Sequence, residues 1–244
     1  MFVCKMIANI VLTIGMPMLL IWVTYLINNS KNVSKSAVGL LFSLGACSIY
    51  CILLPIAIML QSNPFLAQSL SGLAYRNYVS VGLSEELYKF IILIFILKLG
   101  RPTNLENTSI VYAVTVSLGF AFVENIHYIV YDMTWVTLLG RTFICMPMHW
   151  TYGVCMGYMF EQVILIKQKY HCNCLKILHV FAILLPTLLH GTHDFLIEAD
   201  IDALHALLYD LAAVVTGVVM LIKQGADNSQ TDKNRLGYIQ SSLN

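Results

Sequence analysis

Seven long apolar runs follow one another along this chain, separated by short polar segments. They cover residues 6–27, 37–60, 83–99, 109–131, 136–164, 176–197 and 204–222. A helix of about 20 apolar residues crosses the hydrocarbon core of a bilayer, and each run has roughly that length or more. The pattern therefore predicts an all-α, polytopic membrane helix bundle with about seven transmembrane helices.

Composition supports a membrane environment. Hydrophobic residues make up 58% of the 244 positions and charged residues only 11%, whereas soluble domains average about 25% charged residues. The net charge of +1 comes without a basic patch, so we expect the lipid bilayer, and no nucleic acid, as a partner. We expect one transmembrane domain over 1–223, an interfacial segment at 61–82, and a polar, disordered cytoplasmic tail over 224–244.

The basic residues between the runs predict the orientation. Ten of the fourteen lie in segments on one side: Lys31, Lys35, Lys98, Arg101, Lys167, Lys169, Lys176, Lys223, Lys233 and Arg235. Segments rich in Lys and Arg stay in the cytoplasm. We therefore predict a multi-pass protein of the cell membrane with its amino terminus outside and its carboxyl terminus in the cytoplasm. Lys5 argues weakly against this orientation.

Ionisable residues interrupt several of the apolar runs. The core set, on four of them, is Glu85, Glu86, Lys89, Glu124, His149, His190 and Asp194. A charge at the bilayer centre costs about 2.5–3.5 kcal/mol on insertion scales, so such groups face one another rather than lipid. With the predicted orientation, all of them fall in the outer half of four consecutive spans, which predicts one shared intramembrane site.

Spacing within the helices supports this prediction. Glu85 and Glu86 precede Lys89 by four and three residues, so Lys89 can neutralise one carboxylate while the other stays available for a proton. His190 and Asp194 are also four residues apart, so the carboxylate can orient the imidazole or join it on a metal. Gly153 and Gly157, which follow His149, would let a neighbouring helix approach closely.

Four motifs in order resemble those of the PrsW intramembrane proteases. EELYK (85–89) is similar to their EExxK motif and FAFVEN (120–125) to FxxxEN. His149 with Gly153 resembles their third-motif histidine, and HGTHD (190–194) resembles HxxxD. The family is related to the CAAX prenyl endopeptidases and, distantly, to the Aph scaffold subunit of gamma-secretase. The resemblance implies an intramembrane endopeptidase that cuts a membrane-anchored, anti-sigma-factor-like protein near its extracytoplasmic face.

The resemblance also implies the residues of the site. They are Glu85, Glu86, Lys89, Glu124, Asn125, His149, His190 and Asp194. Two mechanisms stay open at this point. In one, a glutamate alone activates water and a histidine or Asn125 meets the oxyanion. In the other, a divalent metal such as zinc is bound by ligands from His149, His190, Asp194 and Glu124.

Two other classes of protein fit the same residues. A non-catalytic scaffold or sorting subunit is one, and a proton-coupled transporter is the other, since intramembrane carboxylates and histidines also relay protons.

His193 lies off the face shared by His190 and Asp194, so we expect a structural role for it, and Asp210 is left unassigned. Most of the seven cysteines lie in apolar runs, where a free cysteine behaves as a small hydrophobe.

Overall fold

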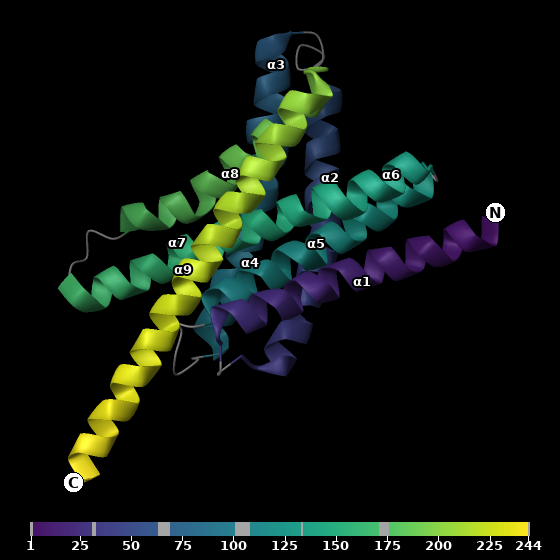
Figure 1. Cartoon of the computed structure of the whole chain (residues 1–244). Coiled ribbons are helices and arrows are strands. Elements are labelled where there is room, and N and C mark those ends of the chain that lie inside the picture. The colour runs from purple at the N-terminus through teal and green to yellow at the C-terminus, as the bar shows by residue number, and fades with distance from the viewer. Residues whose placement is uncertain are drawn as a thin grey trace.

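The computed structural model is almost entirely helical in the residues it describes, which are 2–30, 33–62, 69–100, 108–132, 134–170 and 176–243. Its helices are α1 (Phe2–Asn28), α2 (Lys35–Ser62), α3 (Leu70–Tyr75), α4 (Ser84–Gly100), α5 (Ser109–Tyr131), α6 (Trp135–Gly140), α7 (Met146–Tyr170), α8 (Lys176–Glu198) and α9 (Ala203–Leu243) (Figure 1). Two π-helical segments, η2 (Arg76–Leu83) and η4 (Arg141–Cys145), join α3 to α4 and α6 to α7. Seven continuous helices result in this part of the chain, and the predicted all-α membrane bundle is confirmed.

Within the described residues, four segments are long and apolar enough to cross a membrane. They are Ile7–Asn28, Ser109–Tyr131, His179–Glu198 and Ala203–Gln230. In α5 the most apolar window is 78% buried, against 17% in α1 and 22% in α9. Apolar surface on α1 and α9 therefore faces outward, as expected of lipid-exposed helices, whereas α5 forms the centre of the bundle.

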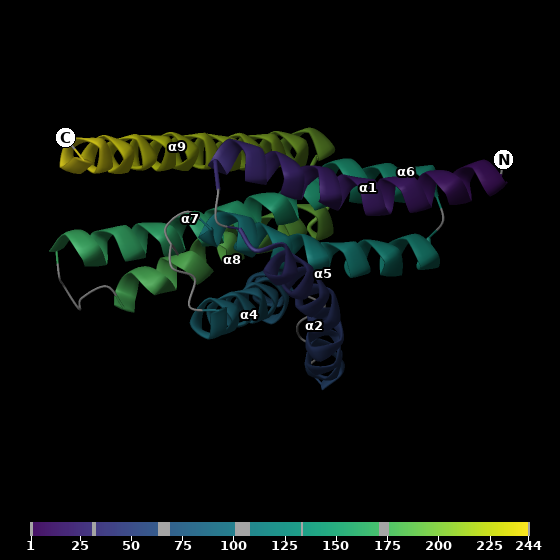
Figure 2. The ribbon, with the colours of Figure 1, turned by 90° about the horizontal axis from the view of Figure 1, so that it is seen from below.

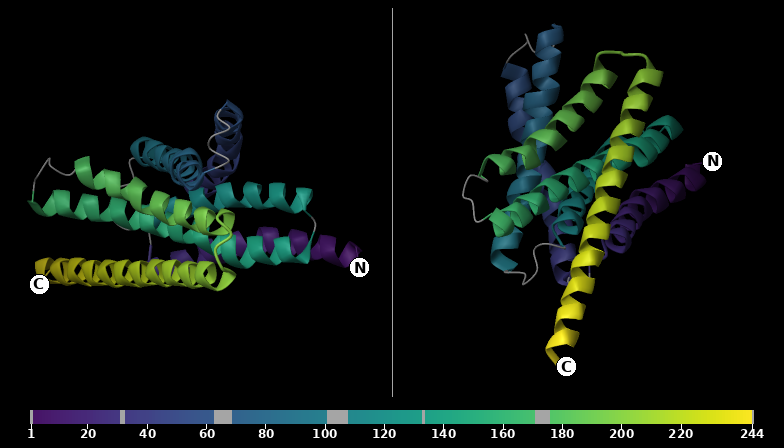
Figure 3. Two further views of the ribbon diagram at one scale, coloured as in Figure 1. Left: turned by 90° about the horizontal axis from the view of Figure 1, so that it is seen from above. Right: turned by 60° about the vertical axis from the view of Figure 1, so that its left-hand side comes forward.

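The helices form three layers around α5. α5 packs against α7 and α2, and α7 also packs against α8 and α9. Figure 2 shows α1 and α9 covering one side of this centre, while α2 and α4 cross it on the opposite side. Figure 3 shows the same arrangement from above and, in its second view, α9 extending beyond the other helices toward the carboxyl terminus. The helices that carry the predicted site residues, α4, α5, α7 and α8, pack against one another in this bundle.

Glycines set the close approach of α5 and α7. A Cβ on Gly153 would lie 2.7 Å from Val114 Cα, and one on Gly157 would lie 2.5 Å from Ile110 Cα. Any larger residue would push the two backbones apart. The sequence prediction that these glycines admit a neighbouring helix is confirmed, and the neighbour is α5.

The tail differs from the sequence-based expectation, and the structure shows the local conformation of the segment expected at the interface. The tail is not disordered in the described residues, because α9 continues to Leu243. Its polar residues find partners on α1: Asn228 Nδ2 donates to the carbonyl oxygen of Asn28 at 2.8 Å, and Asn29 Nδ2 donates to Ser229 Oγ at 3.1 Å. The segment expected at the interface, 61–82, is helical from Leu70 onward and continues directly into α4; its residues 63–68 lie outside the described part.

Candidate active site

The site begins where η2 passes into α4. A Cβ on Gly191 of α8 would lie 2.8 Å from Tyr78 Cα, and one on Gly82 would lie 3.2 Å from the carbonyl oxygen of Thr187. Paired glycines thus bring α8 against η2, directly before the two glutamates of α4. Because π-helical turns inside α-helices often occur at functional sites, the position of η2 beside these residues agrees with a site at this point.

We expect Gly191→Ala to damage this contact. The added methyl group would have to displace backbone atoms of Tyr78, and overpacking of this kind costs about 1–3 kcal/mol. Thermal unfolding of the purified protein in detergent should show a lower melting temperature than the wild type. Gly15→Ala is the matched control, because a Cβ on Gly15 meets nothing within 4 Å. Equal melting temperatures for the two variants would show that the contact is not tight.

Glu86 lies at the centre of the buried polar groups and is fully shielded from solvent. Lys89 Nζ donates to Glu86 Oε1 at 2.7 Å, and His190 Nδ1 lies 2.9 Å from the same oxygen. The other ring nitrogen of His190 is 3.4 Å from Asp194 Oδ2 and 3.8 Å from Glu85 Oε2. The His190 imidazole is therefore surrounded by three carboxylates.

Glu124 forms a second pairing through His149. His149 Nε2 lies 2.8 Å from Glu124 Oε2, and His149 Nδ1 lies 3.2 Å from Lys89 Nζ. Since an ammonium group can only donate, Nδ1 of His149 accepts and Nε2 carries the hydrogen that it donates to Glu124. Arg141 Nη2 reaches the same carboxylate oxygen at 2.8 Å. Lys89 and His149 thus connect the two glutamates of α4 to Glu124 of α5.

Aromatic rings hold these groups in place. The Tyr152 ring stacks on His190 with a centroid distance of 4.8 Å and an angle of 16° between planes. Lys89 Nζ lies 4.4 Å from the centre of the Phe120 ring, and the Arg141 guanidinium lies 4.3 Å from that of Tyr128. Cations are attracted to aromatic faces, more strongly where water is excluded, so these rings stabilise both permanent cations of the site.

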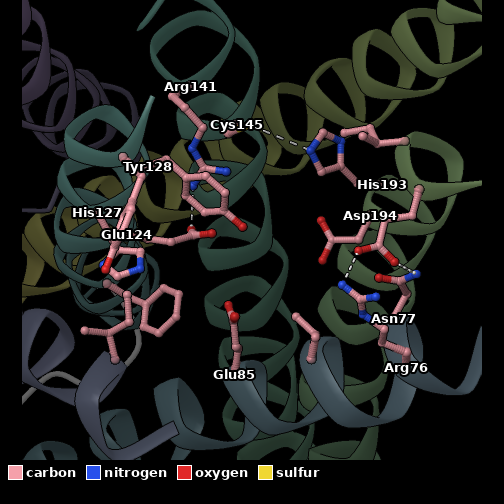
Figure 4. A pocket seen from close by; sticks show the side chains of 16 residues that line it. Arg76, Asn77, Glu85, Glu124, His127, Tyr128, Arg141, Cys145, His193 and Asp194 are labelled. Carbon is pink, nitrogen blue, oxygen red and sulfur yellow. Dashed lines mark hydrogen bonds and ion pairs between the residues drawn. The ribbon is translucent and has the colours of Figure 1, made fainter. Parts of the chain in front are cut away.

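Glu85 differs from its neighbour Glu86. Its Oε2 atom is buried and accepts no hydrogen bond among the described residues, although Lys89 Nζ lies 3.7 Å away. The carboxylate points into a cavity of about 670 Å³, opposite Glu124 and Asp194 (Figure 4). Buried polar atoms without partners are uncommon and call for an explanation such as a catalytic role. Glu85 therefore offers a cavity molecule a carboxylate oxygen that accepts no hydrogen bond among the described residues.

The structure brings seven of the eight residues singled out in the sequence into mutual contact. We call these seven, with Arg141, the polar cluster: Glu85, Glu86, Lys89, Glu124, Arg141, His149, His190 and Asp194. Asn125, the remaining residue, accepts from Arg141 Nε at 2.9 Å and donates to the carbonyl oxygen of Arg141 at 3.0 Å. Both atoms of its amide are therefore engaged, and Asn125 positions Arg141 rather than facing the glutamates of α4.

Sequence reasoning missed Arg141 and Tyr152. Arg141 was not among the residues singled out in the sequence, yet its side chain is mostly buried against Glu124. Its position within the apolar run 136–164, eight residues before His149, was the available signal. Tyr152 follows His149 by three residues and so shares its helix face, which was a signal for its place beside both histidines.

The residues best placed to bind a metal ion differ from the metal ligands predicted from the sequence. Atoms of Glu85, Glu86 and His149 lie within 4.8 Å of one another, and only His149 belongs to the ligands expected from the sequence. Glu124 contacts Arg141 and His149, and His190 contacts Glu86. His149 also has partners, and an ion bound at its Nδ1 atom would replace the contact of this atom with Lys89. The polar cluster contains four carboxylates and two permanent cations: Lys89 contacts Glu85 and Glu86, Arg141 contacts Glu124, and Asp194 contacts His190. With neutral histidines two negative charges remain, which a divalent cation or two protons would neutralise.

Fold and site together define a class: a polytopic helical membrane protein with a buried cluster of carboxylates and imidazoles beside a cavity. Comparison of the sequence with known families makes the class specific. Residues 34–222 match the model of the PrsW family of intramembrane metalloproteases. The chain belongs to this family, as the four motifs had indicated.

Individual relatives agree with the family match. The chain is 32% identical to Protease PrsW of Clostridioides difficile (strain 630) over 164 residues, which are 65% of this chain and 66% of the relative. It is 32% identical to Protease PrsW of Oceanobacillus iheyensis over 121 residues, 50% and 54% of the two chains, and 29% identical to that of Bacillus subtilis (strain 168) over 128 residues, 52% and 56%. The matches thus span about half to two thirds of the relatives' length. No solved structure matches the chain.

Proposed function

We propose that this protein is an intramembrane endopeptidase that hydrolyses a peptide bond of a membrane-anchored protein. The observation that carries the proposal is the carboxylate of Glu85, whose Oε2 atom is buried and accepts no hydrogen bond among the described residues, and which lines a cavity of about 670 Å³. Peptide hydrolysis needs a group that takes a proton from water and groups that meet the developing negative charge. Membership of a protease family supports the same activity.

The contacts of the polar cluster divide these tasks. Glu85 holds and deprotonates a water in the cavity. Glu86 remains charged because Lys89 and His190 both contact its Oε1 atom. Arg141 lines the cavity beside Glu124 and can donate to the oxygen on which negative charge develops. His190 lies between three carboxylates and can return the proton to the leaving amine.

The residues present also fit a divalent metal ion. Glu85 Oε2 and Glu86 Oε2 are both buried without hydrogen-bond partners among the described residues, and the polar cluster has two carboxylates more than it has permanent cations. Glu85, Glu86 and His149 would hold the ion, and in that case Glu85 would be a ligand instead of the free base. When bound, it makes a coordinated water easier to deprotonate and polarises a carbonyl group. Zinc accepts this combination of carboxylate and imidazole ligands.

Metal analysis of the purified protein tests this assignment directly. We expect about one equivalent of zinc per chain. In His149→Gln the zinc content should be lower by about tenfold or more, because the two remaining glutamates are fewer than the three protein ligands of a usual catalytic zinc site. His127→Gln is the control, since His127 contacts Tyr131 rather than the donor group. Loss of zinc should also lower the melting temperature, which is a readout independent of proteolysis. Equal metal content in both variants would exclude His149 as a ligand.

We further propose the substrate and the orientation. The cavity is bordered by Arg76, Asn77 and Glu198 at one end, and positive-inside counting places this end at the outer face. A single-pass protein, such as an anti-sigma factor, would then be cut near its extracytoplasmic boundary. The amino terminus would lie outside and the carboxyl terminus in the cytoplasm of the cell membrane.

Mapping of new protein amino termini tests the function without a known substrate. Membranes of cells that express the wild type or Glu85→Gln would be compared by mass spectrometry. We expect new termini in single-pass membrane proteins, close to the outer end of their spans, in the wild-type sample alone. Identical termini in the two samples would contradict the proposal. If the purified protein instead moved protons across the membrane of a vesicle and cleaved no protein, it would be a proton-coupled transporter.

A further inference from the structure

A second set of polar side chains lies across the cavity from Glu85. Cys145 ends η4, His193 lies on α8 and Asp210 on α9. His193 Nδ1 is 2.8 Å from Asp210 Oδ1, and His193 Nε2 is 3.9 Å from Cys145 Sγ. His193 is 5% exposed and Asp210 is 7% exposed. Three separate elements therefore align a thiol, an imidazole and a carboxylate (Figure 4 shows the first two).

The order of contacts determines the direction of the hydrogen bonds. A carboxylate can only accept, so Nδ1 of His193 carries the hydrogen donated to Asp210. The free electron pair of Nε2 then faces the thiol of Cys145, which becomes the donor. A nucleophile beside a base that is oriented by a third group is the general arrangement that activates serine and cysteine side chains.

Cys145 is also placed where a small molecule can reach it. It is partly exposed and, with His193, lines the 670 Å³ cavity that contains Glu85. Cys155 provides a contrast, because it is buried and its Sγ contacts Met220 Sδ at 3.8 Å. The polar cluster makes no use of Cys145 or His193, so their alignment is not explained by the proposed hydrolysis.

We propose that Cys145 is a covalent modification site for small electrophiles, and that hydrogen peroxide is the class of oxidant it takes. The sulfur attacks one peroxide oxygen, an S–O bond forms and the O–O bond breaks. His193 accepts the thiol proton and passes it to the leaving hydroxide, so that water is released and the thiol becomes a sulfenic acid. The sulfur is oxidised and the peroxide is reduced.

Modification at this point would obstruct the cavity. Cys145 and Glu85 line the same space, so an added oxygen or a larger adduct on sulfur reduces the room for a substrate. This consequence rests on the proposed protease function, whereas the reactivity of Cys145 does not. The two can therefore be tested separately.

The reactivity is tested by alkylation of the full chain in proteoliposomes with iodoacetamide, followed by mass spectrometry of each cysteine peptide. We expect Cys145 to be labelled about tenfold or more slowly in His193→Gln than in wild type, because a positioned base contributes about 10²-fold or more. His127→Gln, which alters another histidine of the same cavity, should leave the rate unchanged. Equal rates for His193→Gln and wild type would overturn the proposal.

Two further measurements keep the test decisive. Labelling of the buried Cys155 reports unfolding. If it appears in His193→Gln, Asp210→Asn replaces that variant and should likewise slow labelling of Cys145.

With hydrogen peroxide followed by a dimedone probe, we expect the sulfenic acid adduct on Cys145 in wild type and its loss in His193→Gln. An equal yield of the Cys145 adduct in wild type and His193→Gln would contradict the assigned role of His193. Treated wild type should lose cleavage activity while Cys145→Ser retains its own untreated level.

Discussion

Glu85→Gln should abolish proteolysis while leaving the fold intact. An amide cannot take a proton from water, and removal of a general base slows catalysis by about 10²–10⁴-fold. The substitution keeps the size of the side chain. The Oε2 atom accepts no hydrogen bond among the described residues, so little stabilising contact is lost. The measurement is the amount of cleavage product formed per enzyme in proteoliposomes, together with the melting temperature of each variant.

A matched substitution separates this effect from a general loss of charge. Glu198 also lines the cavity but forms an ion pair with Arg76 at 2.6 Å, with both side chains about one third exposed. Surface pairs of this kind contribute about 0–1 kcal/mol, so Glu198→Gln should reduce cleavage far less than Glu85→Gln. If Glu85→Gln folded normally and kept more than a tenth of wild-type activity, Glu85 would not be the base that we propose.

The apolar pattern predicted the fold well because the bilayer constrains length and polarity together. Spans must be long enough to cross the hydrocarbon, and their ionisable groups must face one another. Those two conditions placed Glu86, Glu124, His149 and His190 in one layer, and the structure joins them through contacts of 2.7–3.2 Å with each other and with Lys89. The family resemblance indicated, in addition, that these residues belong to four motifs in a fixed order along the chain.

Two causes explain the features that the sequence did not predict: interruptions of regular helix geometry, and contacts between elements far apart in the chain. One residue of an α-helix turns the side chain by about 100°, so the extra residue in a π-helical turn moves every later side chain to another face. Arg141 begins such a segment, and helical spacing could not show that it reaches Glu124. The Cys145–His193–Asp210 alignment depends on three elements far apart in sequence. Likewise, the helical continuation of α9 depends on partners supplied by α1.

Lys89→Met should be the most destabilising single substitution in the polar cluster. Lys89 is 0% exposed and contacts Glu86 Oε1 at 2.7 Å and His149 Nδ1 at 3.2 Å. Without the ammonium group, the Glu86 carboxylate keeps only His190 as a hydrogen-bond donor in a site shielded from water. Breaking a buried ion pair by removing one partner costs about 3–5 kcal/mol. The free energy of unfolding, measured by SDS titration in mixed micelles, should fall by that amount.

The double variant Lys89→Met/Glu86→Gln distinguishes a lost charge partner from lost packing. Glutamine carries no charge, so the buried carboxylate that Lys89→Met leaves uncompensated is absent, while the methionine keeps most of the volume of the lysine stem against Phe120. Replacing both members of a buried pair with neutral groups is often close to neutral in stability, and contacting residues couple by about 0.5–3 kcal/mol. We therefore expect the double variant to be more stable than Lys89→Met alone. Additive losses would mean that packing, rather than charge, makes Lys89 necessary.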